Sequence, residues 1–243
     1  MDPVEASLVI ILAGLAAFTQ SLSGFGFSLF IVPPLALVVG PKDAVVLANS
    51  LGTAVNVAMI TRAHEHIDWR LGFTLLAGAA AGMPVGLVVL VVIDPTPLQI
   101  LIAIVVLVST VLVWRGATLH GAGRFGDAAV GVVSGILNTS TSMSGPPVVL
   151  YLQGRGVAPE AFRATLAAYF FASSLIATTL FVVGGRFTSD IVMVAVASIP
   201  ALGIGWVAGN RVYGRLDPVQ FRRVVIGVLL ASGVIALVTA FAR

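Results

Sequence analysis

Residues 71–93 read LGFTLLAGAAAGMPVGLVVLVVI, a run without a single charged side chain. A helix that crosses the hydrocarbon core of a bilayer needs about 20 such residues. Charged residues make up 9% of the 243-residue chain, whereas a soluble domain carries about 25%. The run does not alternate between polar and apolar residues as the strands of a membrane β-barrel do. The sequence therefore predicts an all-α polytopic membrane protein.

Further apolar segments lie on both sides of this run, and no linker or low-complexity tail separates them. They cover about 6–22, 25–40, 43–61, 69–93, 97–114, 127–137, 146–153, 160–184, 189–210 and 218–241. We expect one membrane domain over residues 1–243, whose acidic start is unlike a cleaved signal peptide. The net charge of +3 comes from basic residues that stand singly between apolar segments. This pattern is typical of membrane topology and not of nucleic-acid binding.

Glycine and proline recur in the same order in the two halves of the chain. The spacing of Gly14 and Gly24 returns in Gly135 and Gly145, and the series Gly82, Gly86, Asp94-Pro95 returns in Gly205, Gly209, Asp217-Pro218. Because all these matches have an offset near 120 residues, we expect two internal repeats, at about 6–116 and 124–243.

The opening segment of each repeat, such as residues 6–40, is too long for one crossing of about 20 residues. We expect a re-entrant or broken helical hairpin there, followed by three transmembrane helices. If each hairpin returns to its own side, the repeats are inverted. Lys42, Arg186 and Arg243 then lie on one side and the other ten Lys and Arg residues on the opposite side. The positive-inside rule places this excess in the cytoplasm and both termini outside. Hairpins that span fully give the same division.

Two polar stretches, TQSLSGFG (19–26) and NTSTSMSGPP (138–147), would form the turns of these hairpins and meet near the bilayer midplane. Irregular backbone is tolerated at that depth only where it is buried or lines a wet cavity. The second arm of each hairpin would then point its N-terminus inward, and its N–H groups and dipole favour an anion. This arrangement is typical of secondary transporters with broken helices. Helix-to-helix hydrogen bonding is the structural alternative.

The candidate substrate-binding residues come from these turns and from residues 43–61, where Asn49, Thr53 and Asn56 share one helix face. They are Gln20, Ser21, Ser23, Gly24, Phe25, Gly26, Asn49, Thr53, Asn138, Thr139, Ser140, Thr141, Ser142, Ser144 and Gly145. Among them, Gly24, Gly26 and Gly145 would permit tight turns, and Ser144 would cap the helix that begins near Pro146.

The Ser23-Gly24-Phe25-Gly26 turn with Ile31-Val32-Pro33, and the helix with Gly78, Gly82, Pro84 and Gly86, resemble the TauE/SafE family of sulfite exporters. The resemblance covers about residues 8–240. It implies export of sulfite, organosulfonates or related anions across the bacterial cytoplasmic membrane. Many family members are glycine-rich at the second turn, where this chain has Asn138–Ser144. Other oxyanions and carboxylates therefore remain alternative substrates.

The sequence lacks the motifs of catalysis: there is no HExxH, no nucleotide loop and no Ser/His/Asp set at one membrane depth. It also lacks a metal or cofactor motif. We expect a secondary transporter that works by alternating access on a small anion, with a passive anion channel as the alternative. A proton as coupling ion and a homo-oligomer both stay open, although no carboxylate lies in the middle of an apolar segment.

Overall fold

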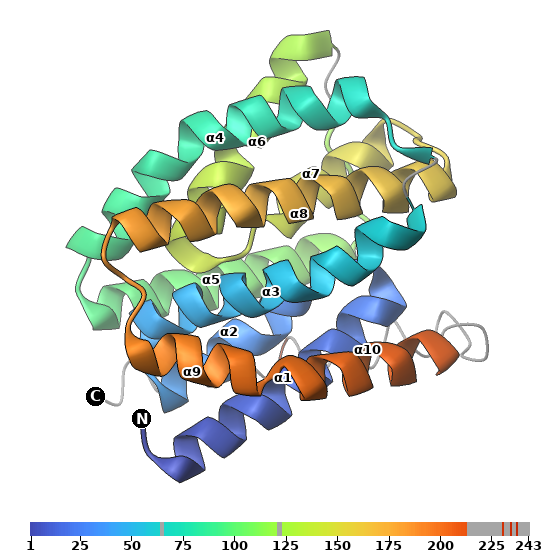
Figure 1. Cartoon of the computed structure of the whole chain (residues 1–243). Helices are drawn as coiled ribbons and strands as arrows, with labels where there is room; N and C mark the ends of the chain where they lie inside the picture. The colour runs from blue at the N-terminus through green and yellow to red at the C-terminus, as the bar shows by residue number, and fades with distance from the viewer. Residues whose placement is uncertain (64–65, 121–122, 213–229, 231–233, 235–236, 238–243) are drawn as a thin grey trace.

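The computed structural model describes residues 1–63, 66–120 and 123–212, together with the single residues 230, 234 and 237. Within these residues the chain is helical and forms no strand, as Figure 1 shows. The helices are α1 (Pro3–Ser23), α2 (Phe27–Val38), α3 (Pro41–Ala63), α4 (Trp69–Val92), α5 (Pro95–Trp114), α6 (Gly123–Thr141), α7 (Gly145–Gly154), α8 (Pro159–Val183), α9 (Ser189–Ala197) and α10 (Ile199–Val212).

Among the described residues, six stretches are long and apolar enough to cross a membrane. They are α1, α3, α4, α5, α8 and the pair α9–α10, which together cover Ser189–Val212. The break between α9 and α10 lies just before Pro200, which has no N–H to continue the helical hydrogen bonds. The prediction of a polytopic helical membrane protein is confirmed. The apolar segment 218–241 lies outside the described residues.

Each of the two predicted repeats opens with a long helix followed by a short one. The first arms, α1 and α6, have 21 and 19 residues, whereas α2 and α7 have 12 and 10. At 1.5 Å per residue the short arms extend only about 15–18 Å, about half of the hydrocarbon core. Each opening segment is therefore a broken hairpin. The inverted orientation of the two repeats stays a prediction.

The helix ends give the register between the repeats. The end of α1 at Ser23 and of α6 at Thr141 are 118 positions apart, as are the starts of α2 and α7 and those of α3 and α8. This register pairs Gly24 with Ser142, so the expected pairing of Gly24 with Gly145 is wrong by three residues. It was wrong because the polar residues 138–141 continue α6 rather than forming the turn.

Glycines let helices of one repeat pack closely on helices of the other. A Cβ atom at Gly82 or Gly86 on α4 would overlap the carbonyl oxygen of Val132 or Ile136 on α6. On the other side of the bundle, Gly205 and Gly209 on α10 meet the carbonyls of Gly14 and Phe18 on α1 in the same way. In the 118-residue register Gly14 corresponds to Val132 and Phe18 to Ile136, so the two crossings are equivalent. Small residues at such spacings are typical of membrane helix pairs.

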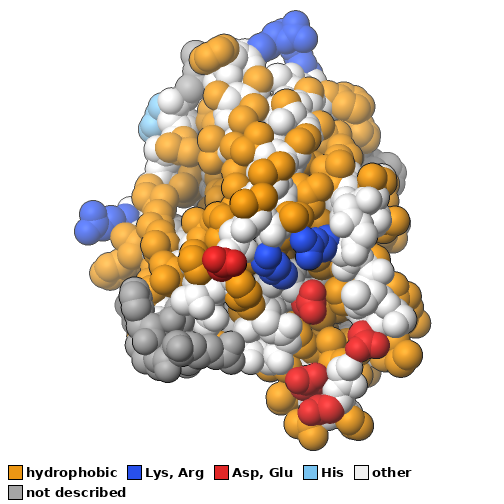
Figure 2. All heavy atoms as spheres, turned by 90° about the vertical axis from the view of Figure 1, so that its left-hand side faces the viewer, with side chains coloured by type: hydrophobic (Ala, Val, Ile, Leu, Met, Phe, Trp, Pro, Cys, Tyr) orange, Lys and Arg blue, Asp and Glu red, His pale blue; other side chains and the backbone are white. Residues whose placement is uncertain are grey.

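One end of the bundle is the more acidic, and Figure 2 looks onto it. It carries the starts of α1 and α9, joined by the ion pair of the Met1 ammonium with Asp190 at 2.6 Å. It also carries the start of α3, where Lys42 donates to the carbonyl of Val91 at 2.8 Å. The side chains at this end include Asp2, Glu5, Lys42, Asp43, Asp94, Arg186 and Asp190. The positive-inside rule assigns this acidic end to the outside, which stays a prediction.

Candidate functional site

The two hairpin turns meet at a cavity in the centre of the bundle. The hydroxyl oxygens of Ser28 and Ser142, one from each hairpin, lie 3.2 Å apart. The volume open to water is about 40 Å³, space for roughly three water molecules at about 10–15 Å³ each. The residues that line it are Gln20, Phe25, Gly26, Phe27, Ser28, Leu29, Ala48, Asn49, Gly52, Asn56, Asn138, Ser142, Met143, Ser144, Gly145, Pro146, Phe170 and Ser174.

The N-terminus of α2 supplies backbone donors to this cavity. Gly26 holds the N-cap position with a φ of 95° and has no side chain of its own with which to cap the helix. The first intrahelical bond runs from the N–H of Phe30 to the carbonyl of Gly26. The N–H groups of residues 27–29 precede that bond and, like the first donors of any helix, need partners from outside it. The cavity wall therefore includes the positive end of a helix dipole.

The N-terminus of α7 contributes less. It begins at Gly145, followed by Pro146 and Pro147, which have no backbone N–H. The first turn of α7 thus offers the Gly145 N–H alone. The expected capping bond from Ser144 is absent, since its side chain makes no cap hydrogen bond. The two hairpins meet at one cavity, but α2 carries most of the backbone donors.

Ser142 has a φ of 61°, a left-handed conformation that is uncommon for a residue other than glycine. The equivalent residue of the first hairpin, Gly24, has a φ of 80°. Left-handed backbone costs a non-glycine residue about 1–2 kcal/mol, and here it accompanies a hydroxyl that reaches Ser28. Gly145, expected in the turn itself, is instead the first helical residue, and it lies against the ring of Phe170.

A relay of hydrogen bonds holds the second turn from behind. The Tyr169 hydroxyl on α8 donates to the Ser134 oxygen at 2.6 Å, and the Ser134 hydroxyl donates to the carbonyl of Ser144 at 2.6 Å. All three residues are buried. The relay fixes the Ser144 carbonyl away from the cavity and positions the turn relative to α6 and α8.

Three buried amide atoms at the cavity have no hydrogen-bond partner: Gln20 Oε1, Asn49 Oδ1 and Asn138 Nδ2. The other ends of two of these amides are held. Asn49 Nδ2 donates to the carbonyl of Ser174 and the hydroxyl of Thr178, at 3.1 and 2.9 Å. Gln20 Nε2 donates to Asn56 Oδ1 at 2.7 Å. Because an unpaired buried polar group costs about 1–3 kcal/mol, these atoms indicate a polar occupant, either water or a ligand.

None of the described residues that line the cavity is charged. Its remaining wall is apolar and includes Phe25, Phe27, Met143 and Phe170. Phe27 on α2 packs against Gly52 on α3, while Phe170 on α8 packs against Gly145 on α7. In the 118-residue register, Phe27 corresponds to Gly145 and Gly52 to Phe170. The large and the small partner have thus exchanged places between the repeats.

The structure places eight of the fifteen candidate residues in the cavity wall and six elsewhere. The eight are Gln20, Phe25, Gly26, Asn49, Asn138, Ser142, Ser144 and Gly145. The six are Ser21, Gly24, Thr53, Thr139, Ser140 and Thr141. The hydroxyls of Thr53, Ser140 and Thr141 donate to carbonyls four residues earlier in their own helices, and that of Thr139 donates to Met83 on α4. The side chain of Ser23 lies outside the described residues.

The candidate set omitted Ser28, Gly52, Asn56 and Ser174, which also line the cavity. Asn56 Nδ2 lies 3.5 Å from the Ser174 oxygen, and these residues are equivalent in the 118-residue register. Asn56 lies on the helix face already predicted for Asn49 and Thr53, and aligning the repeats by this register would have identified Ser174. Ser28 carries no comparable signal, since its equivalent is Pro146.

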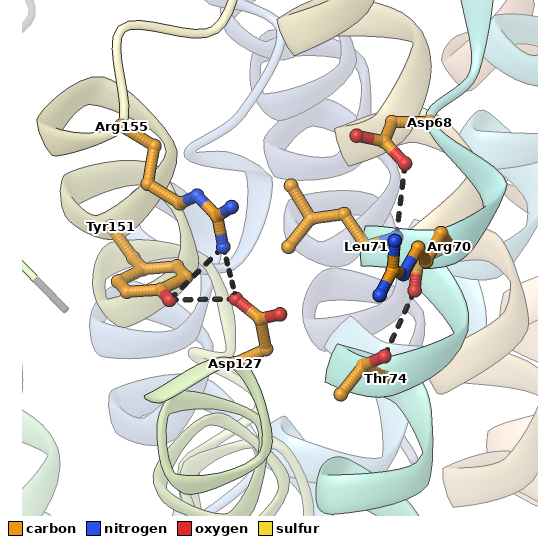
Figure 3. A network of polar contacts seen from close by, with 7 residues as sticks. All are labelled: Asp68, Arg70, Leu71, Thr74, Asp127, Tyr151 and Arg155. Carbon is orange, nitrogen blue, oxygen red and sulfur yellow. Dashed lines mark hydrogen bonds and ion pairs between the residues drawn. The ribbon is translucent and has the colours of Figure 1, made fainter. Parts of the chain in front are cut away.

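A second polar cluster closes the open end of the second hairpin. Figure 3 shows Tyr151 and Arg155, from the end of α7, directed at Asp127 near the start of α6. Asp127 Oδ1 accepts from the Tyr151 hydroxyl at 2.6 Å and from the Arg155 guanidinium at 2.5 Å. The equivalent residues of the first hairpin are Val9, Pro33 and Leu37, which are apolar. We call Asp127, Tyr151 and Arg155 the latch. No pattern in the sequence predicts it, because its three members are far apart in the chain and form no motif.

Comparison with known proteins agrees with the resemblance in the sequence. The family described as sulfite exporter TauE/SafE matches residues 9–236. A curated protein from Cupriavidus necator, named "Probable sulfite/organosulfonate exporter TauE", is 28% identical over 253 aligned residues, which cover 95% of each chain. No solved structure matches the chain.

Proposed function

The chain belongs to the sulfite exporter TauE/SafE family, and on this premise we propose that it exports sulfite, an organosulfonate or a related small sulfur-containing anion. It would do so as a secondary transporter in the bacterial cytoplasmic membrane, with both termini outside. The two repeats would rock about the central cavity, so that the cavity opens alternately to each side.

One observation carries this proposal. The first residues of α2, the hydroxyls of Ser28 and Ser142, and the unpartnered Nδ2 of Asn138 lie at one cavity. Together they form a set of donors without fixed charge, which suits an oxyanion that must bind and then leave. The aromatic wall of Phe25, Phe27 and Phe170 would accommodate an apolar substituent on the sulfur.

The test is transport into proteoliposomes that contain the purified protein. Sulfite, thiosulfate, methanesulfonate and the sulfur-free dicarboxylate succinate would each be presented, with and without a proton gradient. Saturable movement of a sulfur anion supports the proposal, and acceleration by the gradient would identify the proton as the coupling ion. Movement of succinate alone would point to a carboxylate transporter, and movement of none would overturn the proposal.

A pair of variants tests whether the cavity is the binding site. Asn138→Leu keeps the side-chain size and removes an amide donor without a protein partner. Because a hydrogen bond to a charged group contributes about 1.5–3 kcal/mol, the substrate concentration for half-maximal transport should rise at least about tenfold. Thr141→Val is the matched control, since the Thr141 hydroxyl bonds within α6 and does not line the cavity. If both variants have the same half-saturation concentration, Asn138 does not contribute to substrate binding.

A further inference from the structure

A second, larger pocket lies beside the central cavity. Its volume open to water is about 320 Å³, and its described lining includes Ser21, Met59, Arg163 and Asn210. On α1 the two spaces meet at adjacent residues, Gln20 in the cavity and Ser21 in this pocket. On α3 they are one turn apart, at Asn56 and Met59. We call this second pocket the vestibule.

Side chains separate the vestibule from the cavity. Gln20 Nε2 donates to Asn56 Oδ1 at 2.7 Å and contacts the sulfur of Met59 at 3.2 Å. These three side chains span from α1 to α3, and rotation of a side chain does not require the helices to move apart.

The vestibule contains the fixed positive charge that the cavity lacks. Arg163 on α8 lines it, and its Nε would lie 4.0 Å from a Cβ atom at Gly24, in the first hairpin turn. The pair His66 and Glu160, 3.9 Å apart, stands at the vestibule with both side chains exposed. Arg163 is half-buried and comes closest to the turn that leads to the N-terminus of α2.

We propose that the vestibule is an anion-binding station in which Arg163 holds the sulfonate or sulfite before it enters the central cavity. This inference rests on the proposed function. A guanidinium binds a trigonal or tetrahedral oxyanion through two parallel hydrogen bonds, and low-dielectric walls strengthen its attraction for an anion. The anion then moves from the charged Arg163 in the vestibule to the central cavity, which binds it through dipoles alone. Neither site therefore binds the anion so tightly that its release becomes slow.

Transport in oriented vesicles tests the station. Arg163→Gln should raise the half-saturation concentration about tenfold or more when the anion is presented on the vestibule side. The maximal rate should change by less than about twofold, because the central donors are intact. Arg163→Lys keeps the charge but loses the paired hydrogen bonds, so its half-saturation concentration should lie between those of wild type and Arg163→Gln. Arg115→Gln is the matched control, since Arg115 is exposed and does not line the vestibule. A half-saturation in Arg163→Gln equal to that of the control would overturn the proposal.

A binding measurement separates this proposal from the transport proposal. The chain has no cysteine, so Asn210→Cys introduces a single thiol at the vestibule. Methanesulfonate should slow its alkylation by N-ethylmaleimide, relative to sodium chloride at equal ionic strength, and should have no such effect once Arg163→Gln is added. Protection without any transport would retain the station and reject the exporter. Transport without protection, or protection that survives Arg163→Gln, would reject the station and retain the exporter.

Discussion

The left-handed backbone of Ser142 allows stability and binding to be separated by one substitution, Ser142→Gly. Three terms act on stability. Relief of the left-handed conformation gains about 1–2 kcal/mol, loss of the hydroxyl contact to Ser28 costs about 0.5–1.5 kcal/mol, and the greater freedom of glycine in the unfolded chain costs about 0.5–1 kcal/mol. The terms nearly cancel, and the apparent melting temperature should stay within a few degrees of wild type.

The same substitution should weaken the binding of the substrate anion. The Ser142 hydroxyl lines the cavity and stands 3.2 Å from that of Ser28, so its loss removes a donor from the anion. At about 1.5 kcal/mol or more for a hydrogen bond to a charged ligand, half-saturation should rise at least about tenfold. The result would be a protein as stable as wild type that binds its substrate poorly.

Ser142→Ala is the matched comparison, because it removes the same hydroxyl but keeps a Cβ in left-handed backbone. It should transport as poorly as Ser142→Gly and melt about 2 °C lower, since the relieved strain exceeds the cost of glycine freedom by under about 1 kcal/mol. The assays are thermal unfolding in detergent, followed by intrinsic fluorescence, and initial transport rates over a range of concentrations. A Gly variant that melts below the Ala variant would refute the argument from backbone strain. A Gly variant with wild-type half-saturation would refute the role of the hydroxyl in binding.

Three further predictions concern packing, the latch and topology. Gly205→Ala should lower the melting temperature by several degrees or prevent folding, because its Cβ would overlap the carbonyl of Gly14, whereas Gly203→Ala meets nothing within 4 Å and should be neutral or stabilising; equal melting temperatures would contradict the close crossing of α1 and α10. Asp127→Ala should destabilise the protein by about 2 kcal/mol, since it removes the acceptor of the Tyr151 hydroxyl and the counter-charge of Arg155. Tyr151→Phe should destabilise it by about 1 kcal/mol. A lower melting temperature for Tyr151→Phe than for Asp127→Ala would show that the latch does not depend on Asp127. In intact cells an impermeant thiol reagent should label Lys42→Cys, and it should label Arg163→Cys only after the cells are permeabilised. Labelling of both variants in intact cells would exclude the inverted arrangement.

Much of the fold could be predicted because it depends on local composition. Long apolar runs between Pro and Gly residues defined α3, α4, α5 and α8 to within a few residues, since such runs have few other stable states in a bilayer. The hairpin turns were harder. Ser140 and Thr141 looked like turn residues, but their hydroxyls bond carbonyls four residues earlier and let α6 continue.

The lining of the cavity was predicted in part for the same reason, and its role in binding substrate stays a proposal. Gln20, Asn49 and Asn138 were identified because buried amides in an apolar chain are costly and need a purpose. Ser28, Gly52 and Phe170 were missed, since a small or aromatic side chain is ordinary in a membrane helix and only its place beside the cavity distinguishes it. The Asp127 latch depends on α6 and α7 folding back on each other, which no local pattern contains.

The exchange of Phe27 and Gly145 between equivalent positions has a kinetic consequence. Under the proposed mechanism the inward-open and outward-open states interconvert when each repeat adopts the conformation that the other repeat had before. Because equivalent positions of the two repeats carry different residues, such as Ser28 on one hairpin and Pro146 on the other, the two states have different free energies. Detailed balance forbids such an asymmetry from creating a gradient by itself. If the asymmetry makes the half-saturation concentrations on the two faces differ, detailed balance requires the maximal rates of forward and reverse flux to differ in the same ratio.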